Sequence, residues 1–223
     1  MKKYVSALPF FFVACIIAGC ASKPIPEWRY ESFGQLENYK INYLKSKDQV
    51  AEFHYRKTLE EVKRSGDLKL IAKVYLTKYA LKAAVLEDVA DSDYLDMDVI
   101  EPDKENRNFF VFLQGNLSIV DAKLLPAQYG PFLKAALGGK EREVNDAVSK
   151  IDDSLSCLIA IGITVKKNLY NEETLQTAVN TASANGWQKP LLAHLGKLEQ
   201  YYEATNEKAK ASKIRQKIKA IKN

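Results

Sequence analysis

Apolar residues recur every three or four positions along most of this sequence, and this spacing constrains the fold more than any other feature. In the segment 48–64, for example, Ala51, Tyr55, Leu59 and Val62 follow one another at such steps. The spacing matches the roughly 3.6 residues of an α-helical turn, so each helix has one apolar face that other helices must cover. We therefore predict an all-α fold built of antiparallel helical hairpins.

Short turns separate the predicted helices. Gly66 can adopt the positive φ that often ends a helix, and the carboxylate of Asp67 can cap the next one, so these two helices should fold back on each other. Asn171 can cap a later helix in the same way. The pattern predicts helices over residues 33–45, 48–64, 67–86, 141–167, 172–184, 190–204 and 207–222.

The predicted helix 141–167 is the longest, and its second half is apolar on all sides. Such a helix must be surrounded by other elements, so we expect residues 155–165 at the centre of the core. Cys157 lies in this segment, with no histidine near it in the sequence. We interpret Cys157 as a buried structural thiol, and a reactive thiol is the alternative.

The segment 87–107 is rich in aspartate and glutamate, and we interpret it as an acidic connector. The pairs Asp91-x-Asp93 and Asp96-x-Asp98 also allow a calcium hypothesis, because hard cations bind clustered carboxylate oxygens. However, apolar residues stand where a calcium loop of the EF-hand type needs its third oxygen ligand. A solvated linker is therefore favoured.

Residues 108–120 permit two structures. Four apolar residues at 109–112 are followed by Gly115-Asn116 and a second apolar run, which is typical of a short β-hairpin. The same residues can form another helix. Of the two, we favour the helix.

The N-terminus has the order of an export signal. A positively charged start is followed by an apolar stretch over residues 4–17 and by small residues before Cys20. The apolar run is shorter than the roughly 18 residues that a membrane-spanning helix needs, and Pro9 interrupts it. We therefore predict a signal peptide over residues 1–19.

The tetrapeptide Ile17-Ala18-Gly19-Cys20 resembles the lipobox of bacterial lipoproteins. The resemblance implies that Cys20 receives a diacylglyceryl group, becomes the first residue after cleavage, and gains an amide-linked acyl chain such as palmitate. Ala21 and Ser22 stand where an aspartate commonly retains such proteins at the inner membrane. The resemblance therefore implies a lipid-anchored protein on the periplasmic face of the outer membrane.

The residues after Cys20 suggest a tether. Pro24 and Pro26 disfavour a helix, so we expect residues 20–32 to form an extended lipidated segment before a helical domain over 33–223. Removal of residues 1–19 and acylation of Cys20 would leave Cys157 as the remaining thiol. An intramolecular disulfide is then excluded, and folding must rely on packing.

The predicted hairpins resemble those of tetratricopeptide-type and other α-solenoid proteins. Ala51 and Tyr55 match the small and aromatic pair of the second repeat helix, and Leu195-Gly196 matches a pair of the first, but Glu199 replaces the tyrosine of the motif. The resemblance implies a TPR-like or irregular α-solenoid and supplies no catalytic residue. Two segments, 152–160 and 182–192, are similar to stretches of bacterial lipoproteins that have helical bodies and no assigned activity.

Residues with catalytic potential are few and scattered. The two histidines, His54 and His194, fall on separate predicted helices, and we interpret both as partly buried at the edge of the core. The pairs Glu60-Glu61 and Glu172-Glu173 would suit a glycosidase only if two carboxyls faced each other across a cleft, whereas adjacent helical residues point apart. We predict no catalytic residue, no metal site and no cofactor.

The C-terminal segment 207–223 carries seven basic residues against one glutamate. Ala211, Ile214, Ile218 and Ile221 form an apolar stripe along it, so the charges should point outward. A solvated capping helix explains this pattern, and contact with anionic lipid, lipopolysaccharide or an acidic protein is the functional hypothesis. The basic residues are Lys208, Lys210, Lys213, Arg215, Lys217, Lys219 and Lys222.

These observations lead to three functional hypotheses. The first is a membrane-anchored, non-catalytic helical scaffold or adaptor for another envelope protein. The second is a binder of a small or lipid-like ligand in an inter-helical cavity, to which Trp187, Tyr201 and Tyr202 could contribute if they are not core residues. The third is a peptidoglycan enzyme. Nucleic acid is not an expected partner of an exported protein.

Overall fold

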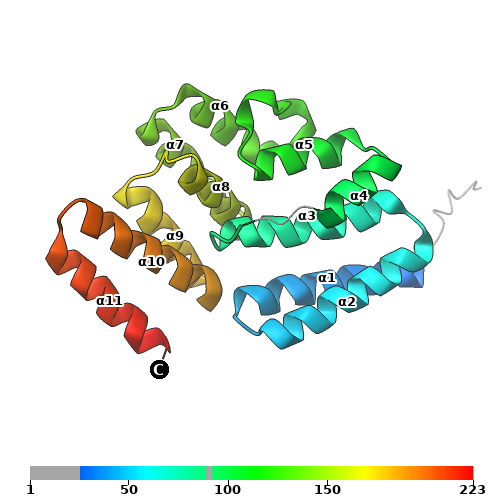
Figure 1. Ribbon diagram of the computed structural model, residues 1–223, viewed down its shortest axis with the longest axis horizontal. Coiled ribbons are helices and arrows are strands. Elements are labelled where there is room, and N and C mark those ends of the chain that lie inside the picture. Colours follow the sequence, from blue (N-terminus) through cyan, green and yellow to red (C-terminus); the bar gives the residue numbers. More distant parts are fainter. Residues whose placement is uncertain (1–25, 89–91, 223) are drawn as a thin grey trace, which may run out of the picture.

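The computed structural model describes residues 26–88 and 92–222 as a succession of helices (Figure 1). These residues form eleven α-helices and three short 3-10 helices, and no β-strand occurs among them. The all-α prediction is confirmed. The predicted signal peptide and Cys20 lie outside the described residues, so both stay predictions.

The first three helices turn back on one another (Figure 1). They are α1 (Glu27–Leu44), α2 (Asp48–Ser65) and α3 (Leu68–Ala84). Gly66 ends α2 with a φ of 67°, and Asp67 caps α3 by accepting a hydrogen bond from the N–H of Leu70 at 3.0 Å. Both turn signals in the sequence are confirmed.

Helix α1 begins before the residue at which the sequence predicts it. Residues 27–32, which the sequence assigns to the tether 20–32, are helical. Pro26 precedes them, and its carbonyl accepts a hydrogen bond from the N–H of Arg29 at 3.0 Å. Because a helix start leaves its first N–H groups unpaired, proline is tolerated there, and Pro26 opens the helix.

The acidic segment 87–107 is largely folded, which corrects its interpretation as a connector. It contains α4 (Ser92–Ile100) and the start of α5 (Lys104–Leu113). Arg107 donates two hydrogen bonds to the buried Asp98, at 2.6 and 2.9 Å. Asp103 caps α5 through the N–H of Asn106 at 3.0 Å. These carboxylates therefore stabilise local structure, a role that acidic composition alone does not reveal.

The segment 108–120 starts as a helix, and the β-hairpin alternative is wrong. It completes α5, turns at Gly115 with a φ of 77°, and enters η1 (Leu117–Ile119). Two further short 3-10 helices, η2 (Ala122–Leu124) and η3 (Ala127–Tyr129), lead to α6 (Gly130–Gly138).

The single helix predicted over residues 141–167 is wrong, because a turn divides it into α7 (Glu141–Val148) and α8 (Ser154–Lys166). Asp153 caps α8 by accepting a hydrogen bond from the N–H of Ser156 at 2.7 Å. Ile151 is buried in the turn itself. The apolar period thus continues through a residue that is not helical, which conceals the break in the sequence.

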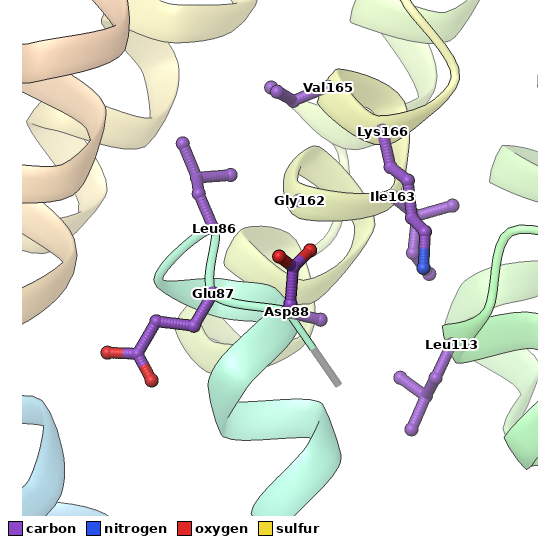
Figure 2. Close-up of a pocket in the computed structure, with 9 residues that line it drawn as sticks. Leu86, Glu87, Asp88, Leu113, Gly162, Ile163, Val165 and Lys166 are labelled. Atoms are coloured by element: carbon purple, nitrogen blue, oxygen red, sulfur yellow. The ribbon is translucent and has the colours of Figure 1, made fainter. Parts of the chain in front are cut away.

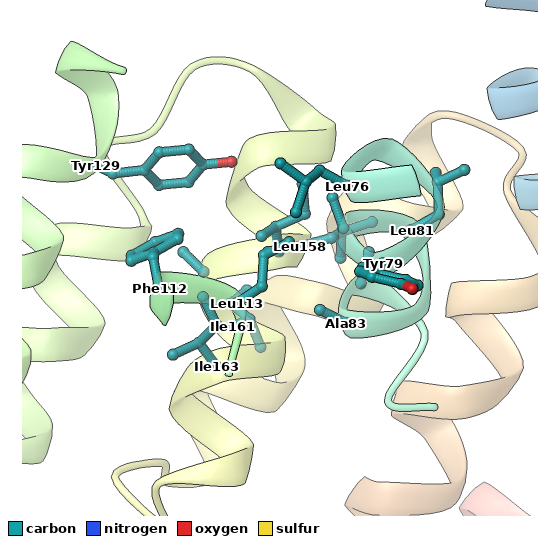
Figure 3. Packing of buried hydrophobic residues seen from close by; sticks show 14 of the residues in the cluster. Leu76, Tyr79, Leu81, Ala83, Phe112, Leu113, Tyr129, Leu158, Ile161 and Ile163 are labelled. Atoms are coloured by element: carbon teal, nitrogen blue, oxygen red, sulfur yellow. The ribbon is translucent and has the colours of Figure 1, made fainter. Parts of the chain in front are cut away.

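The contact between α3 and α8 lies at the centre of the core (Figure 3). Residues 156–164 of α8 are all buried, as the sequence predicts. Phe112 and Tyr129 pack beside them from α5 and η3 (Figure 3). At the closest approach, a Cβ atom at Gly162 would overlap the carbonyl group of Ala83. The missing side chain at Gly162 lets the two backbones touch.

The last three helices form two successive antiparallel hairpins at one end of the molecule (Figure 1). They are α9 (Glu172–Ala184), α10 (Gln188–Ala204) and α11 (Lys208–Lys222), and they enclose a smaller apolar cluster of their own. Asn171 caps α9 through the N–H of Thr174 at 3.0 Å, as predicted. The hairpins are confirmed, whereas their assignment to a TPR-like repeat stays a prediction.

Helix α10 joins these hairpins to the first half of the chain. Its His194 is fully buried. The Nε2 of this ring donates a hydrogen bond to the carbonyl oxygen of Ala84, at the end of α3, at 3.0 Å. Lys189 pairs with Asp48 of α2 at 2.8 Å and lies 3.9 Å from the ring centroid of Tyr43. Helix α10 therefore contacts α1, α2 and the end of α3, all of which precede it by more than a hundred residues.

Candidate functional site

The basic C-terminal segment forms an amphipathic helix. All seven Lys and Arg residues that the sequence analysis singles out lie on α11 and are exposed. On the other side, Ala211 is buried, and Ile214, Ile218 and Ile221 pack on the cluster shared with α9 and α10. The predicted apolar stripe is confirmed, and it directs the cations away from the body.

Arg215 is already occupied by the protein itself. It donates hydrogen bonds to Glu199 at 2.7 Å and to Glu203 at 2.6 Å, both on α10. The hydrogen bond to Glu199 and its charge raise the pKa of Arg215 above the usual value. Arg215 therefore ties one edge of α11 to α10.

Lys210 ties the other edge. It pairs with Glu207 at 2.6 Å and with Glu172 of α9 at 3.2 Å, and it lies 5.0 Å from the ring centroid of Tyr202. Hydrogen bonds to Glu207 and Glu172 raise the pKa of Lys210. Within residues 26–88 and 92–222, five of the seven cations have no carboxylate within ion-pair distance: Lys208, Lys213, Lys217, Lys219 and Lys222.

A second surface, which sequence analysis did not find, lies between α1, α2 and α3. We call it the α1–α3 groove. Its volume is about 250 Å³, and Arg29 and Lys73 contribute cations to a mainly apolar lining. Phe33 belongs to the groove and is 63% exposed, and Tyr30, one helical turn earlier, is 78% exposed. The other lining residues are Ser32, Leu36, Thr58, Val62, Leu70 and Val74.

The sequence contains a signal for this groove that the predicted tether hides. Tyr30 and Phe33 stand three residues apart, so in a helix they share one face. The sequence analysis places the helix start at residue 33 and Tyr30 in the tether, so it does not predict that the two residues share a helix face. The early start of α1 is what places both residues on one helix, one turn apart.

A smaller cavity lies where the end of α3 meets α8 (Figure 2). Its volume is about 160 Å³, and Leu86, Leu113 and Val165 contribute apolar side chains. The Glu87 side chain extends away from Leu113 in Figure 2, and it accepts a hydrogen bond from the Tyr43 hydroxyl at 2.9 Å. A cavity of this volume suits a group about the size of one small ring rather than a lipid chain.

Cys157 is buried on α8, as the sequence predicts. Its thiol donates a weak hydrogen bond to the carbonyl oxygen of Val148 at 3.5 Å. Burial raises the pKa of Cys157, so the nucleophilic thiolate is disfavoured. These properties support its interpretation as a structural residue.

The two histidines lie on different helices and differ in burial. His54 of α2 is half-buried, and its Nδ1 lies 2.6 Å from the Oε1 of Gln35. His194 is fully buried, which corrects its interpretation as an edge residue. Burial lowers the pKa of His194 to about 4, so the ring is neutral at pH 7. The role of His194 is to connect α10 with α3.

Three of the four adjacent carboxylates, Glu60, Glu61 and Glu172, form ion pairs on helix surfaces, and Glu173 is exposed. Glu60 pairs with Arg64 at 2.7 Å and with Lys57 at 3.1 Å, and Glu61 pairs with Arg64 at 2.8 Å. Glu172 accepts a hydrogen bond from the Tyr202 hydroxyl at 2.6 Å. In the part of the chain that the structure describes, no three His, Cys, Asp or Glu residues are grouped to hold a metal ion; Asp91 lies outside it.

The aromatic residues near the C-terminus do not share one open groove. Trp187 packs against the main core, whereas Tyr202 is buried in the smaller cluster of α9–α11. The Tyr201 ring is 6.0 Å from that of Tyr202, centroid to centroid. The three residues therefore stabilise two separate cores.

The chain matches no protein-family model, and no curated protein or solved structure is significantly similar to it. Within residues 26–88 and 92–222, none of the helices combines the length and the apolar character needed to cross a bilayer. The surfaces described above are thus the basis for an argument about function.

Proposed function

We propose that this chain is a lipid-anchored, non-catalytic helical adaptor that binds another protein of the bacterial envelope. The lipid anchor is inferred from the leader and from the resemblance of residues 17–20 to a lipobox. The outer membrane is the proposed location, because Ala21 and Ser22 follow Cys20. A water-soluble helical body would then hang from acyl chains on Cys20.

The α1–α3 groove is the observation that carries the adaptor proposal. Exposed aromatic side chains beside an apolar groove are typical of protein docking sites, since they bury a large area at a small loss of conformational entropy. Phe33 provides such a side chain in the groove, and Tyr30 precedes it by one turn of α1; both are more than half exposed. We infer that an apolar segment of the partner occupies the groove, with an acidic residue near Arg29 or Lys73.

Photocrosslinking in living cells tests this proposal. A photoreactive residue in place of Phe33 should yield a covalent product with one envelope protein, whereas the same residue in place of Ile119 should not. Ile119 is a matched control because it is 72% exposed and lies outside the groove. Equal products at both positions, or none at Phe33, would contradict the adaptor proposal.

Mass spectrometry tests the anchor separately. The N-terminal peptide of the native protein should start at Cys20 and carry the mass of its acyl chains. A chain that starts at Met1, or a free thiol at Cys20, would contradict the lipid anchor without bearing on the groove.

The lining of the same groove also supports a second candidate function, the binding of a lipid-like ligand. An acyl chain could contact Leu36, Val62 and Val74 while its anionic head lies near Arg29 or Lys73. Native mass spectrometry distinguishes the candidates, because only a ligand-binding protein should retain a small anionic lipid that Leu36→Arg, a change at a partly buried lining residue, removes. The peptidoglycan-enzyme alternative has no comparable support in the described carboxylates.

A further inference from the structure

The five unpaired lysines of α11 form two rows along the helix. Successive helical residues are rotated by about 100°, so residues three, four or seven apart share a side. Lys208, Lys219 and Lys222 therefore follow the edge held by Arg215, and Lys213 and Lys217 follow the edge held by Lys210. The helix contains no acidic residue that could neutralise them.

The strip between the two rows consists of uncharged residues. It consists of Ala209, Ser212, Gln216 and Ala220, all exposed. Protein interfaces depend on a few aromatic or large apolar anchors at their centre, and this strip has none. The outward side of α11 is therefore suited to a broad, fluid, negatively charged surface rather than to a complementary protein surface.

The type of cation points the same way. The single arginine, whose planar group is suited to paired contacts with carboxylates, is already bound to Glu199 and Glu203. All five free cations are lysines, which act as mobile point charges. Each lysine near an anionic bilayer contributes attraction without needing a fixed partner geometry.

We propose that α11 binds the anionic headgroups of a lipid bilayer through these five lysines. Helix α11 lies at the end of the molecule opposite the start of α1 (Figure 1). If Cys20 is anchored in the same bilayer, as the proposed function requires, the long axis of the molecule lies along the membrane. The binding of α11 to lipid is independent of that anchor.

Lysine footprinting of the full chain in vesicles tests the proposal. The purified chain is reconstituted into vesicles of phosphatidylcholine alone or of an equimolar mixture with phosphatidylglycerol, and an amine-reactive reagent is added at low salt. Mass spectrometry then measures the modification rate at each lysine. The internal controls are exposed lysines outside α11 that form no ion pair with any residue the structure describes: Lys63, Lys123, Lys134 and Lys150.

We expect the α11 lysines to react about fivefold more slowly on the anionic vesicles than on phosphatidylcholine, and high salt to remove the difference. The control lysines should react equally on both. Equal rates at α11 on both vesicles, or the same slowing at the controls, would overturn the proposal. So would protection by soluble polyglutamate without protection by vesicles, which would assign α11 to an acidic protein.

A charge-matched pair of variants completes the test. Lys213→Gln with Lys217→Gln and Lys219→Gln should abolish the protection of Lys208 and Lys222, whereas Lys63→Gln with Lys123→Gln and Lys134→Gln should preserve it. Identical behaviour of the two triple variants would show that net charge alone is responsible and would overturn the assignment to α11. The N-terminal mass and the Phe33 crosslink report on the adaptor proposal independently.

Discussion

The α3–α8 and α10–α11 contacts are both helix pairs packed through apolar faces, yet they are held together differently. Helices α3 and α8 meet backbone to backbone at Gly162, and no ion pair joins them in the described part of the chain. Helix α11 covers α10 with a stripe of half-buried isoleucines, and Arg215 and Lys210 tie its edges.

This difference separates a rigid centre from a terminal helix that depends on few contacts. At Gly162 the central contact leaves no room for an added atom, so its stability depends on shape. The terminal contact includes exposed ion pairs, which contribute little and are screened by salt. We therefore expect α11 to open locally before the core unfolds.

The largest effect should come from Gly162→Ala. The added methyl group would overlap the carbonyl of Ala83, so the helices must separate, and we expect the free energy of unfolding to fall by about 3 kcal/mol or more. Urea unfolding followed by circular dichroism measures it. Gly196→Ala in α10 is the control: no atom lies within 4 Å of the added Cβ, so a gain of up to about 1 kcal/mol is expected. Equal stability of the two variants would contradict the close contact.

The link between the two regions should weaken in acid. His194 has a pKa of about 4 in the folded chain against an ordinary value of 6.5, so the unfolded chain binds the extra proton between these values. Stability from the neutral ring is therefore complete above about pH 6.5 and falls by about 1.4 kcal/mol per unit toward pH 4, a loss of roughly 3 kcal/mol. His194→Gln cannot titrate and should lose less stability over this range. Urea unfolding at several pH values measures the free energy of unfolding of the unsubstituted protein and of His194→Gln. Parallel dependence of the two free energies on pH would refute a role for His194.

Truncating the apolar stripe should affect α11 alone. Because Ile218 is half-buried, Ile218→Ala should cost about 1 kcal/mol and increase hydrogen exchange of the α11 amides without changing those of α8. Gln216→Ala, on the exposed side of the same helix, is the control and should leave exchange unchanged. Faster exchange throughout the core would mean that the two regions unfold together.

The smallest effect is expected from Arg215→Gln. Its ion pairs with Glu199 and Glu203 are exposed, so global stability should hardly change, while exchange in α11 should increase at low salt and less at high salt. Arg142→Gln provides a comparison, because Arg142 is exposed on α7 and pairs with no carboxylate among the described residues. If Arg215→Gln lowered the unfolding midpoint as much as Ile218→Ala does, the ion pairs would contribute more to the stability of the α10–α11 contact than proposed.

Much of the local structure could be predicted from the sequence, because it depends on neighbouring residues. The turn at Gly66, the caps at Asp67 and Asn171, and the span of α9 all follow from such short-range chemistry. The break before α8 escaped prediction because the buried Ile151 keeps the apolar period within a turn, after which Asp153 caps α8. Periodicity records burial, and a buried turn residue satisfies it as well as a helical one does.

Alone, the sequence determined the all-α class, the buried centre around Cys157, and the amphipathic character of α11, since each depends on the order of residue types along the chain. Only the tertiary structure decided that Gly162 meets Ala83, that His194 holds the end of α3, and that Phe33 lines a groove. It also decided which two of the seven cations of α11 have partners. The physical reason is distance along the chain: these contacts join residues that approach each other only after the helices have packed.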